Sequence, residues 1–108
     1  MKRIAIYSRK SKETDTGESI KNQINICKEY FLRQYDQCTF EIFEDEGFSG
    51  GNTNRPAFKR MMQLADYKQF DIIAAYKVDR ISRNTLDFLT MFEKLKLNDI
   101  ELVSVTEG

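Results

Sequence analysis

The chain has 108 residues, of which 41% are hydrophobic and 31% are charged, which is the size and composition of a single globular domain. Its 17 lysine and arginine residues equal its 17 aspartate and glutamate residues, so the domain has no bulk charge with which to hold duplex DNA tightly by itself. There is no histidine, which excludes histidine as a general base, Ser-His-Asp triads and most zinc sites.

The cysteines and the apolar runs indicate where the protein works. Cys27 and Cys38 do not form a CxxC pair, and Cys27 falls on the apolar face of a predicted helix, which favours a buried, reduced thiol. No segment approaches the ~20 apolar residues that span a membrane. The first apolar run is also too short for a signal peptide. We therefore expect a cytoplasmic protein that does not span a membrane.

The first apolar run, residues 4–7, is bounded by charged residues and predicts a short strand buried on both faces. A basic turn with two hydroxyls, residues 8–11, follows it. In open α/β sheets, ligands bind at the carboxyl ends of the strands. The turn is therefore expected to bind a negatively charged group such as a phosphate.

A helix and a second strand come next. Ser19 is the predicted N-cap of a helix that runs to about Tyr35. Its apolar residues have the spacing of a buried helical stripe: Ile20, Ile24, Cys27, Phe31 and Tyr35. Residues 39–44 alternate between apolar and polar and predict a strand. We expect its acidic end, residues 41–46, to be solvated.

Residues 45–54 contain three of the five glycines and predict a loop at the carboxyl end of the second strand. The only proline, Pro56, suits the first turn of the helix that follows, because its missing N–H costs nothing there. The predicted buried face of this helix consists of Phe58, Met61, Met62 and Ala65.

Residues 71–76 are almost continuously apolar and predict a central third strand. A charged segment, residues 77–83, follows, and then a helix that ends near Asn98 with the apolar stripe Leu86, Leu89, Phe92 and Leu95. Residues 100–105 predict a fourth strand. The alternation of strands and helices predicts a flavodoxin-like, three-layer α/β fold with a four-stranded, mainly parallel central sheet.

In such a fold the strand-to-helix loops open on one edge of the sheet. They would collect a hydroxyl, several cations and an acid there: Arg9, Ser11, Arg55, Lys77, Asp79, Arg80 and Arg83. Guanidinium groups around a hydroxyl suit phosphoryl transfer, because they bind the non-bridging oxygens of the transition state. Asp79 and Arg83 could instead form only a surface ion pair, worth less than ~1 kcal/mol. No carboxylate cluster offers a cation site on this edge, so the arginines would take the place of a metal ion.

These residues stand in motifs that resemble the N-terminal catalytic domain of the serine recombinases, the resolvase/invertase family. The motifs are Tyr7-Ser8-Arg9-Lys10-Ser11, Ser19-Ile20-Lys21-Asn22-Gln23, Gly47-Phe48-Ser49-Gly50, Asn54-Arg55-Pro56 and Asp79-Arg80-Ile81-Ser82-Arg83. The resemblance extends over essentially the whole chain. The segment from Lys77 to Arg80 and the long loop between Ser11 and Ser19 are more similar to large serine integrases and transposases than to small resolvases.

The resemblance implies that Ser11 is the nucleophile, which attacks a DNA phosphodiester and leaves a 5′-phosphoserine link and a free 3′ hydroxyl. It also implies that four arginines bind the scissile phosphate, with the last in an assisting role: Arg9, Arg80, Arg83 and Arg55. Asp79 would orient an arginine or handle a proton, and Gln23 matches an active-site glutamine. Weaker candidates for binding DNA or phosphate are Lys77, Lys10 and Ser49.

The resemblance further implies recombination sites in DNA as the substrate, no cofactor, and a dimer or tetramer of the full-length protein. Residues 1–108 would be the resolvase-type catalytic domain, truncated before the long dimerisation helix and without a DNA-binding domain. We expect this fragment alone not to recombine DNA.

Three alternatives stay open. Ser8 competes with Ser11 as the nucleophile, although a serine at the tip of a strand is commonly structural. The chain could be a non-catalytic, flavodoxin-like module that binds phosphate or a nucleotide through the glycine-rich residues 47–51, but Walker and GxGxxG spacings are absent. It could also be a receiver-like interaction domain, although it lacks an acidic pair after the first strand.

Overall fold

The computed structural model describes the backbone of residues 1–11, 17–47, 56–76 and 85–105. Within these ranges it describes the side chains of residues 1–8, 21–45, 56–76 and 89–105. No helix among these residues is long and apolar enough to cross a membrane.

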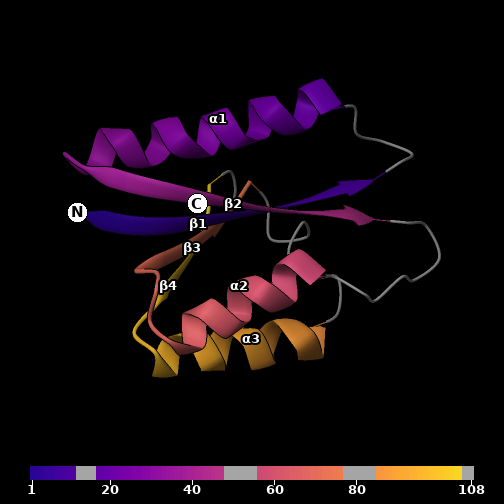
Figure 1. Cartoon of the computed structure of the whole chain (residues 1–108), viewed down its shortest axis with the longest axis vertical. Helices are drawn as coiled ribbons and strands as arrows, with labels where there is room; N and C mark the ends of the chain where they lie inside the picture. Colours follow the sequence, from indigo (N-terminus) through magenta and orange to yellow (C-terminus); the bar gives the residue numbers. More distant parts are fainter. Residues whose placement is uncertain (12–16, 48–55, 77–84, 106–108) are drawn as a thin grey trace.

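A parallel sheet with helices on both faces forms the domain (Figure 1). The strands are β1 (Lys2–Ser11), β2 (Cys38–Gly47), β3 (Ile72–Ala75) and β4 (Glu101–Ser104), and the helices are α1 (Gly17–Gln34), α2 (Pro56–Asp66) and α3 (Thr85–Leu97). The strand order is β2-β1-β3-β4, and every neighbouring pair is parallel. The predicted three-layer α/β fold is confirmed.

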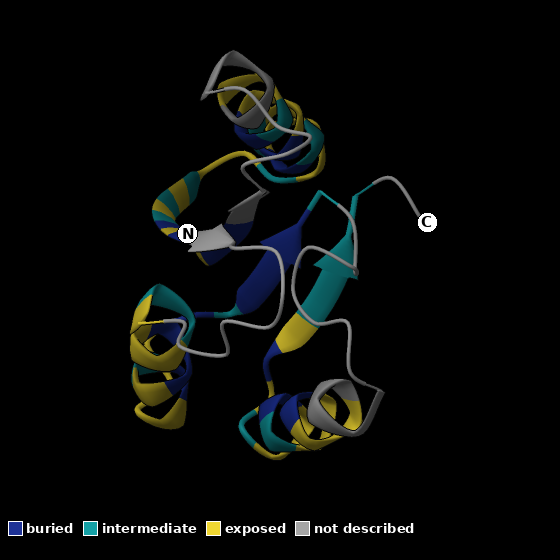
Figure 2. Ribbon diagram, turned by 90° about the vertical axis from the view of Figure 1, so that its right-hand side faces the viewer, coloured by how far each residue is buried: buried dark blue, intermediate teal, exposed yellow. Residues whose placement is uncertain are grey.

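Alternate residues of β1 divide the core into two clusters. Ala5 and Tyr7 pack with buried residues of α2 and α3, whereas Ile4 and Ile6 pack with buried residues of α1. This division follows from the period of two residues in a strand. Figure 2 shows the buried strand residues in the middle of the molecule and the exposed residues on the outer sides of the helices.

The packing faces of α1 and α2 agree with the predictions. Ile24, Cys27 and Phe31 of α1 are buried against the sheet. Helix α2 begins at Pro56 as predicted, and its buried residues are Met61, Met62 and Ala65. The prediction of Ser19 as an N-cap is wrong, because α1 begins two residues earlier, at Gly17.

The predicted packing face of α3 is partly wrong. Among the described side chains of α3 (residues 89–97), Leu95 is buried as expected, but so is Met91, while Leu89 and Phe92 are 52% and 44% exposed. The side chain of Leu86 lies outside the described residues. Apolar residues lie on more than one side of this helix, so their spacing alone did not identify the side that contacts the sheet.

β1 and β2 are longer than predicted. Residues 8–11 are not a turn, and residues 45–47 are not a loop, because β1 and β2 stay paired as far as Ser11 and Gly47. β3 pairs only with residues Ile4 to Tyr7 of β1. Residues 8–11 of β1 and 44–47 of β2 therefore form a two-stranded extension beyond β3, visible in Figure 1 and called the β1–β2 extension below.

At the opposite edge of the sheet, Asp71 ties the start of β3 to β1. Its carboxylate accepts hydrogen bonds from the backbone N–H of Arg3 at 2.9 Å and from Arg3 Nε at 3.4 Å. These hydrogen bonds to Arg3 lower the pKa of the Asp71 carboxyl. Since the bonds favour the charged carboxylate, they stabilise the fold at neutral pH.

Replacing Asp71 with asparagine should therefore lower the free energy of unfolding by less than ~1 kcal/mol, because both partners are partly exposed. The difference from the unchanged protein should be fully present above the carboxyl's ordinary pKa of 3.8 and should disappear as the pH falls through its lowered pKa. Urea unfolding between neutral pH and pH 3 measures it. Asp36→Asn, an exposed control, should change the free energy of unfolding by less than about 0.5 kcal/mol at neutral pH.

Candidate active site

The carboxyl ends of the parallel strands meet at one edge of the sheet. β1 brings Arg9, Lys10 and Ser11 to this edge, within the β1–β2 extension. Arg9 pairs in register with Asp45, and Ser11 pairs with Gly47. The edge is therefore the place where the predicted nucleophile lies, at the end of a continuous strand.

Most other predicted site residues lie outside the described residues: Ser49, Arg55, Lys77, Asp79, Arg80 and Arg83. Their gathering at the carboxyl edge stays a prediction. In the sequence, Arg55 directly precedes Pro56, the first residue of α2, and Lys77 is two residues after Ala75, the last residue of β3.

Asp45 is the residue that the sequence analysis missed at this edge. Its carboxylate accepts hydrogen bonds from Tyr7 Oη at 2.7 Å and from the backbone N–H groups of Ala57 and Phe58 at 2.9 and 3.0 Å. The last two are N–H groups of the first turn of α2, which have no partner within the helix. Asp45 thus caps α2 and places a negative charge at the positive end of its dipole.

The prediction of a solvated acidic segment is therefore wrong for Asp45, which is 5% exposed, but holds for Glu41 and Glu44, which are exposed. The reason is that three hydrogen bonds compensate for removing the carboxylate of Asp45 from water. No local pattern reveals this, because the partners are 12, 13 and 38 residues away in the sequence.

Tyr7 completes a cluster that joins three elements. It is 1% exposed, and its ring packs edge-on against the ring of Phe58, with 5.4 Å between centroids. We call Tyr7, Asp45, Ala57 and Phe58 the Asp45 cluster. Tyr7 is the last residue of β1 that pairs with β3, so the cluster holds β1, β2 and α2 together where the β1–β2 extension begins.

On the other face of β1, a small crevice lies between the strand and α1. Ser8 and Gln23 line it together with Ile24, Cys27 and Tyr76. Ser8 Oγ and Gln23 Oε1 are buried there without a hydrogen-bond partner among the described residues. Gln23 therefore lies beside β1, and its role in an active site stays a prediction.

The described cysteines and metal-binding residue types were also compared with the requirements of thiol and metal chemistry. Burial raises the pKa of the Cys27 thiol to about 11, so the thiol is protonated near neutral pH and is a weak nucleophile. Cys27 and Cys38 are both free, as predicted. In the part of the chain that the structure describes, no three His, Cys, Asp or Glu side chains lie close enough together to hold a metal ion.

Comparison with known proteins identifies relatives. The family model described as "Resolvase, N terminal domain" matches residues 4–108. A protein of Bacillus subtilis (strain 168) named "Putative DNA recombinase" is 33% identical over 104 residues, which is 94% of this chain and 20% of the relative. The chain thus spans about a fifth of the length of that curated relative.

Two solved structures are also similar. The N-terminal catalytic domain of TP901-1 integrase is 31% identical, with a TM-score of 0.80 over 98% of this chain and 78% of that one. The C-terminal catalytic domain of ISC1926 TnpA, described as an IS607-like serine recombinase, is 24% identical, with a TM-score of 0.78 over 95% of this chain and 70% of that one. The second likeness supports the fold alone.

The family match covers nearly the whole chain, and the motif from Tyr7 to Ser11 lies in one strand that ends at the carboxyl edge. The resemblance inferred from the sequence motifs is confirmed at the level of the family. The chain belongs to the resolvase N-terminal domain family, and it is a catalytic domain of the serine recombinase type.

Proposed function

We propose that this domain cleaves and rejoins DNA at recombination sites through a covalent 5′-phosphoserine intermediate on Ser11. The observation that carries the proposal is the course of β1, which extends past β3 and brings Ser11 to the carboxyl edge of the sheet. The Asp45 cluster stabilises β1 and β2 where this extension begins. Such support matters because a nucleophile must be held in position to react efficiently.

In the proposed first step, Ser11 Oγ gives up its proton and forms a bond to the phosphorus of a DNA phosphodiester. The bond from phosphorus to the 3′ oxygen breaks, and this oxygen takes up a proton and leaves as a 3′ hydroxyl. In the second step, a 3′ hydroxyl attacks the phosphoserine, and Ser11 is released with its proton restored. Each step exchanges one phosphoester for another, so neither step needs a high-energy cofactor.

We assign the charged residues to the phosphate. Arg9, Arg80 and Arg83 bind its non-bridging oxygens, and Arg55 assists them. Guanidinium groups suit this role because they stay protonated and bind two oxygens at once. Asp79 orients an arginine or handles a proton, and Gln23 contributes from α1. Weaker contacts to DNA come from Lys77, Lys10 and Ser49.

The burial of Ser8 favours Ser11 as the nucleophile. Ser8 is 5% exposed and lies in the crevice against α1, where a duplex would have to displace the helix to reach its hydroxyl. Ser11 lies three residues further along β1, in the part of the strand that β3 does not flank. The structural role that the sequence suggested for Ser8 agrees with this position.

At the level of the whole protein, we propose that the partners are DNA and further copies of the same chain, as a dimer or tetramer. Residues 1–108 act as the catalytic domain, and DNA-binding and dimer-forming parts outside them are needed for complete recombination. Similarity to the TP901-1 integrase domain supports a large serine integrase or transposase.

Trapping the intermediate tests the proposed function. The full-length protein is incubated with duplexes that carry its recombination site and a nick beside the cleavage position, so that cleavage releases a short product and religation fails. We expect a protein–DNA adduct that survives denaturation, and mass spectrometry after nuclease digestion should locate the nucleotide on Ser11. A phosphate-binding module without covalent chemistry would yield no adduct, and that result would contradict the proposal.

A further inference from the structure

Helix α2 has two exposed cations, Lys59 and Arg60, in the half that lies at the carboxyl edge of the sheet. Its first turn contains no acidic residue, and the single acid of the helix, Asp66, is its last residue. Positive charge near the amino end of a helix is unfavourable because it faces the positive end of the helix dipole. Lys59 and Arg60 thus place two positive charges in the half of α2 that begins at the carboxyl edge.

The Asp45 cluster places the start of α2 where the β1–β2 extension begins, four residues before Ser11 along β1. Asp45 binds the N–H groups of Ala57 and Phe58, and it pairs in register with Arg9, two residues before Ser11. Lys59 and Arg60 directly follow Phe58. The two cations are thus within one helical turn of the contact between α2 and the strands that form the β1–β2 extension.

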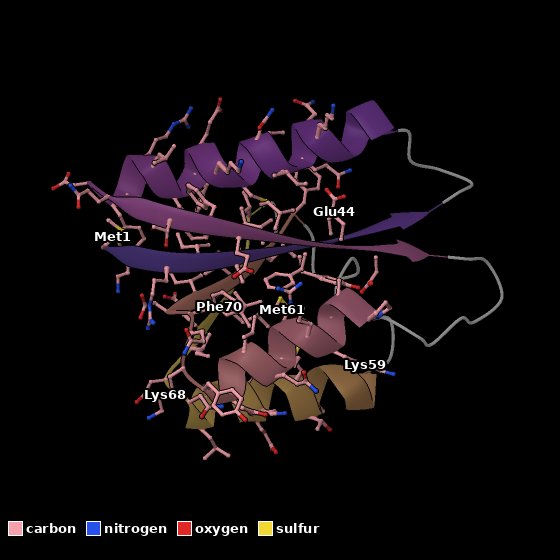
Figure 3. All side chains as sticks on the ribbon, in the orientation of Figure 1. Met1, Glu44, Lys59, Met61, Lys68 and Phe70 are labelled. Atoms are coloured by element: carbon pink, nitrogen blue, oxygen red, sulfur yellow. The ribbon has the colours of Figure 1, made fainter. Side chains whose placement is uncertain are left out.

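The charges differ between the two faces of the sheet at this edge. Phe43 packs in the cluster that contains α2 and α3, and Asp45 bonds to α2, so the exposed Glu44 between them lies on the opposite face, towards α1 (Figure 3). The carboxylate of Asp45 is buried and fully engaged. Among the described side chains, the α2 side of the edge therefore attracts phosphate more strongly than the α1 side.

We propose that Lys59 and Arg60 form a second phosphate-binding site, which holds the sugar–phosphate backbone of duplex DNA on the α2 side of the carboxyl edge. This proposal deepens the proposed function and rests on it. The ligands are two backbone phosphates near the scissile one: Arg60 can bind one of them with two N–H groups, and Lys59 can bind the other as a point charge. Such contacts position the duplex without reading its sequence.

The salt dependence of DNA binding tests the proposal. In full-length protein carrying Ser11→Ala, the affinity for a fluorescent duplex of mixed sequence is measured by anisotropy at several KCl concentrations. Each lost phosphate contact should reduce the slope of log K against log [KCl] by about 0.9, so Lys59→Gln with Arg60→Gln should reduce it by about 1.8. Between about 50 and 200 mM KCl, the double variant should then lose about 12-fold less affinity than the parent.

Two lysines in the same fold serve as matched controls. Lys68 lies beyond the opposite end of α2, and Figure 3 shows it far from Lys59. Lys21 is exposed on α1, on the other face of the sheet. Lys68→Gln and Lys21→Gln should leave the slope unchanged. Lys59→Arg with Arg60→Lys should retain it, and thermal unfolding should show that all variants are folded.

The outcomes separate this proposal from the proposed function. If the double variant has the same slope as its parent, the proposed phosphate site is wrong. If Lys21→Gln reduces the slope and the double variant does not, the duplex lies on the α1 side, and the proposed site is also wrong. The proposed function is tested separately by the adduct on Ser11. If the protein forms that adduct but the slopes do not differ, only the phosphate site fails.

Discussion

Replacing Ser11 with alanine should abolish the covalent protein–DNA adduct completely, because no other hydroxyl is expected to reach the scissile phosphate. The substitution removes one oxygen atom at the end of β1, so the free energy of unfolding should change by less than about 0.5 kcal/mol. Denaturing gels of the full-length protein with nicked duplexes measure the adduct. Anisotropy with intact duplexes measures DNA binding, which should persist.

Ser8→Ala is the matched control for this experiment. Ser8 Oγ is buried without a partner among the described residues, so its removal should leave the fold at least as stable as before. The Ser8→Ala protein should still form the adduct. If the Ser11→Ala protein forms the adduct, or if only the Ser8→Ala protein fails to form it, Ser11 is not the nucleophile and the proposed mechanism is wrong.

Replacing Asp45 with alanine should have the largest effect on stability. It leaves Tyr7 Oη and the N–H groups of Ala57 and Phe58 without their acceptor in a buried environment. The loss of a helix cap costs about 1 kcal/mol, and unsatisfied buried donors cost about 1–3 kcal/mol, so we expect a total of about 3 kcal/mol. In a chain of this size, about 3 kcal/mol lowers the melting temperature by roughly 12–24 °C.

Glu44→Ala is the control for Asp45→Ala, because Glu44 is the preceding residue and is exposed. Its effect should stay within about 0.5 kcal/mol. A double-mutant cycle with Tyr7→Phe should show a coupling of about 0.5–3 kcal/mol between Tyr7 and Asp45, measured by urea unfolding. Equal stabilities of Asp45→Ala and Glu44→Ala would show that the hydrogen bonds of the Asp45 cluster do not stabilise the fold.

The Asp45 cluster should also affect the reaction. Beyond Tyr7, β1 pairs only with β2, and a two-stranded pair without further support is marginally stable. Without Asp45, the position of Ser11 should become less well defined. At a temperature where the Asp45→Ala protein is folded, we therefore expect adduct formation to be slower than in the Glu44→Ala protein, with similar DNA binding.

The sequence by itself determined the order of strands and helices, the parallel sheet and the inner faces of α1 and α2. These features follow from local patterns: buried strands are continuous apolar runs, and the stripe containing Ile24, Cys27 and Phe31 has the helical period. Five motifs in order, the first of them from Tyr7 to Ser11, also identified the family. The parallel strands further predicted that Arg9 and Ser11 lie at the carboxyl edge, because such strands all end on one side of the sheet.

Only the tertiary structure decided the length of β1 and β2, the side of α3 that packs and the role of Asp45. Residues 8–11 are polar, so no apolar pattern marks them as strand, and their partner segment lies about 36 residues away in the register. Met91 rather than Leu89 is buried because the sheet selects one of several apolar sides of α3. Asp45 is buried for the same kind of reason: its hydrogen-bond partners come from β1 and α2, and only folding brings them together.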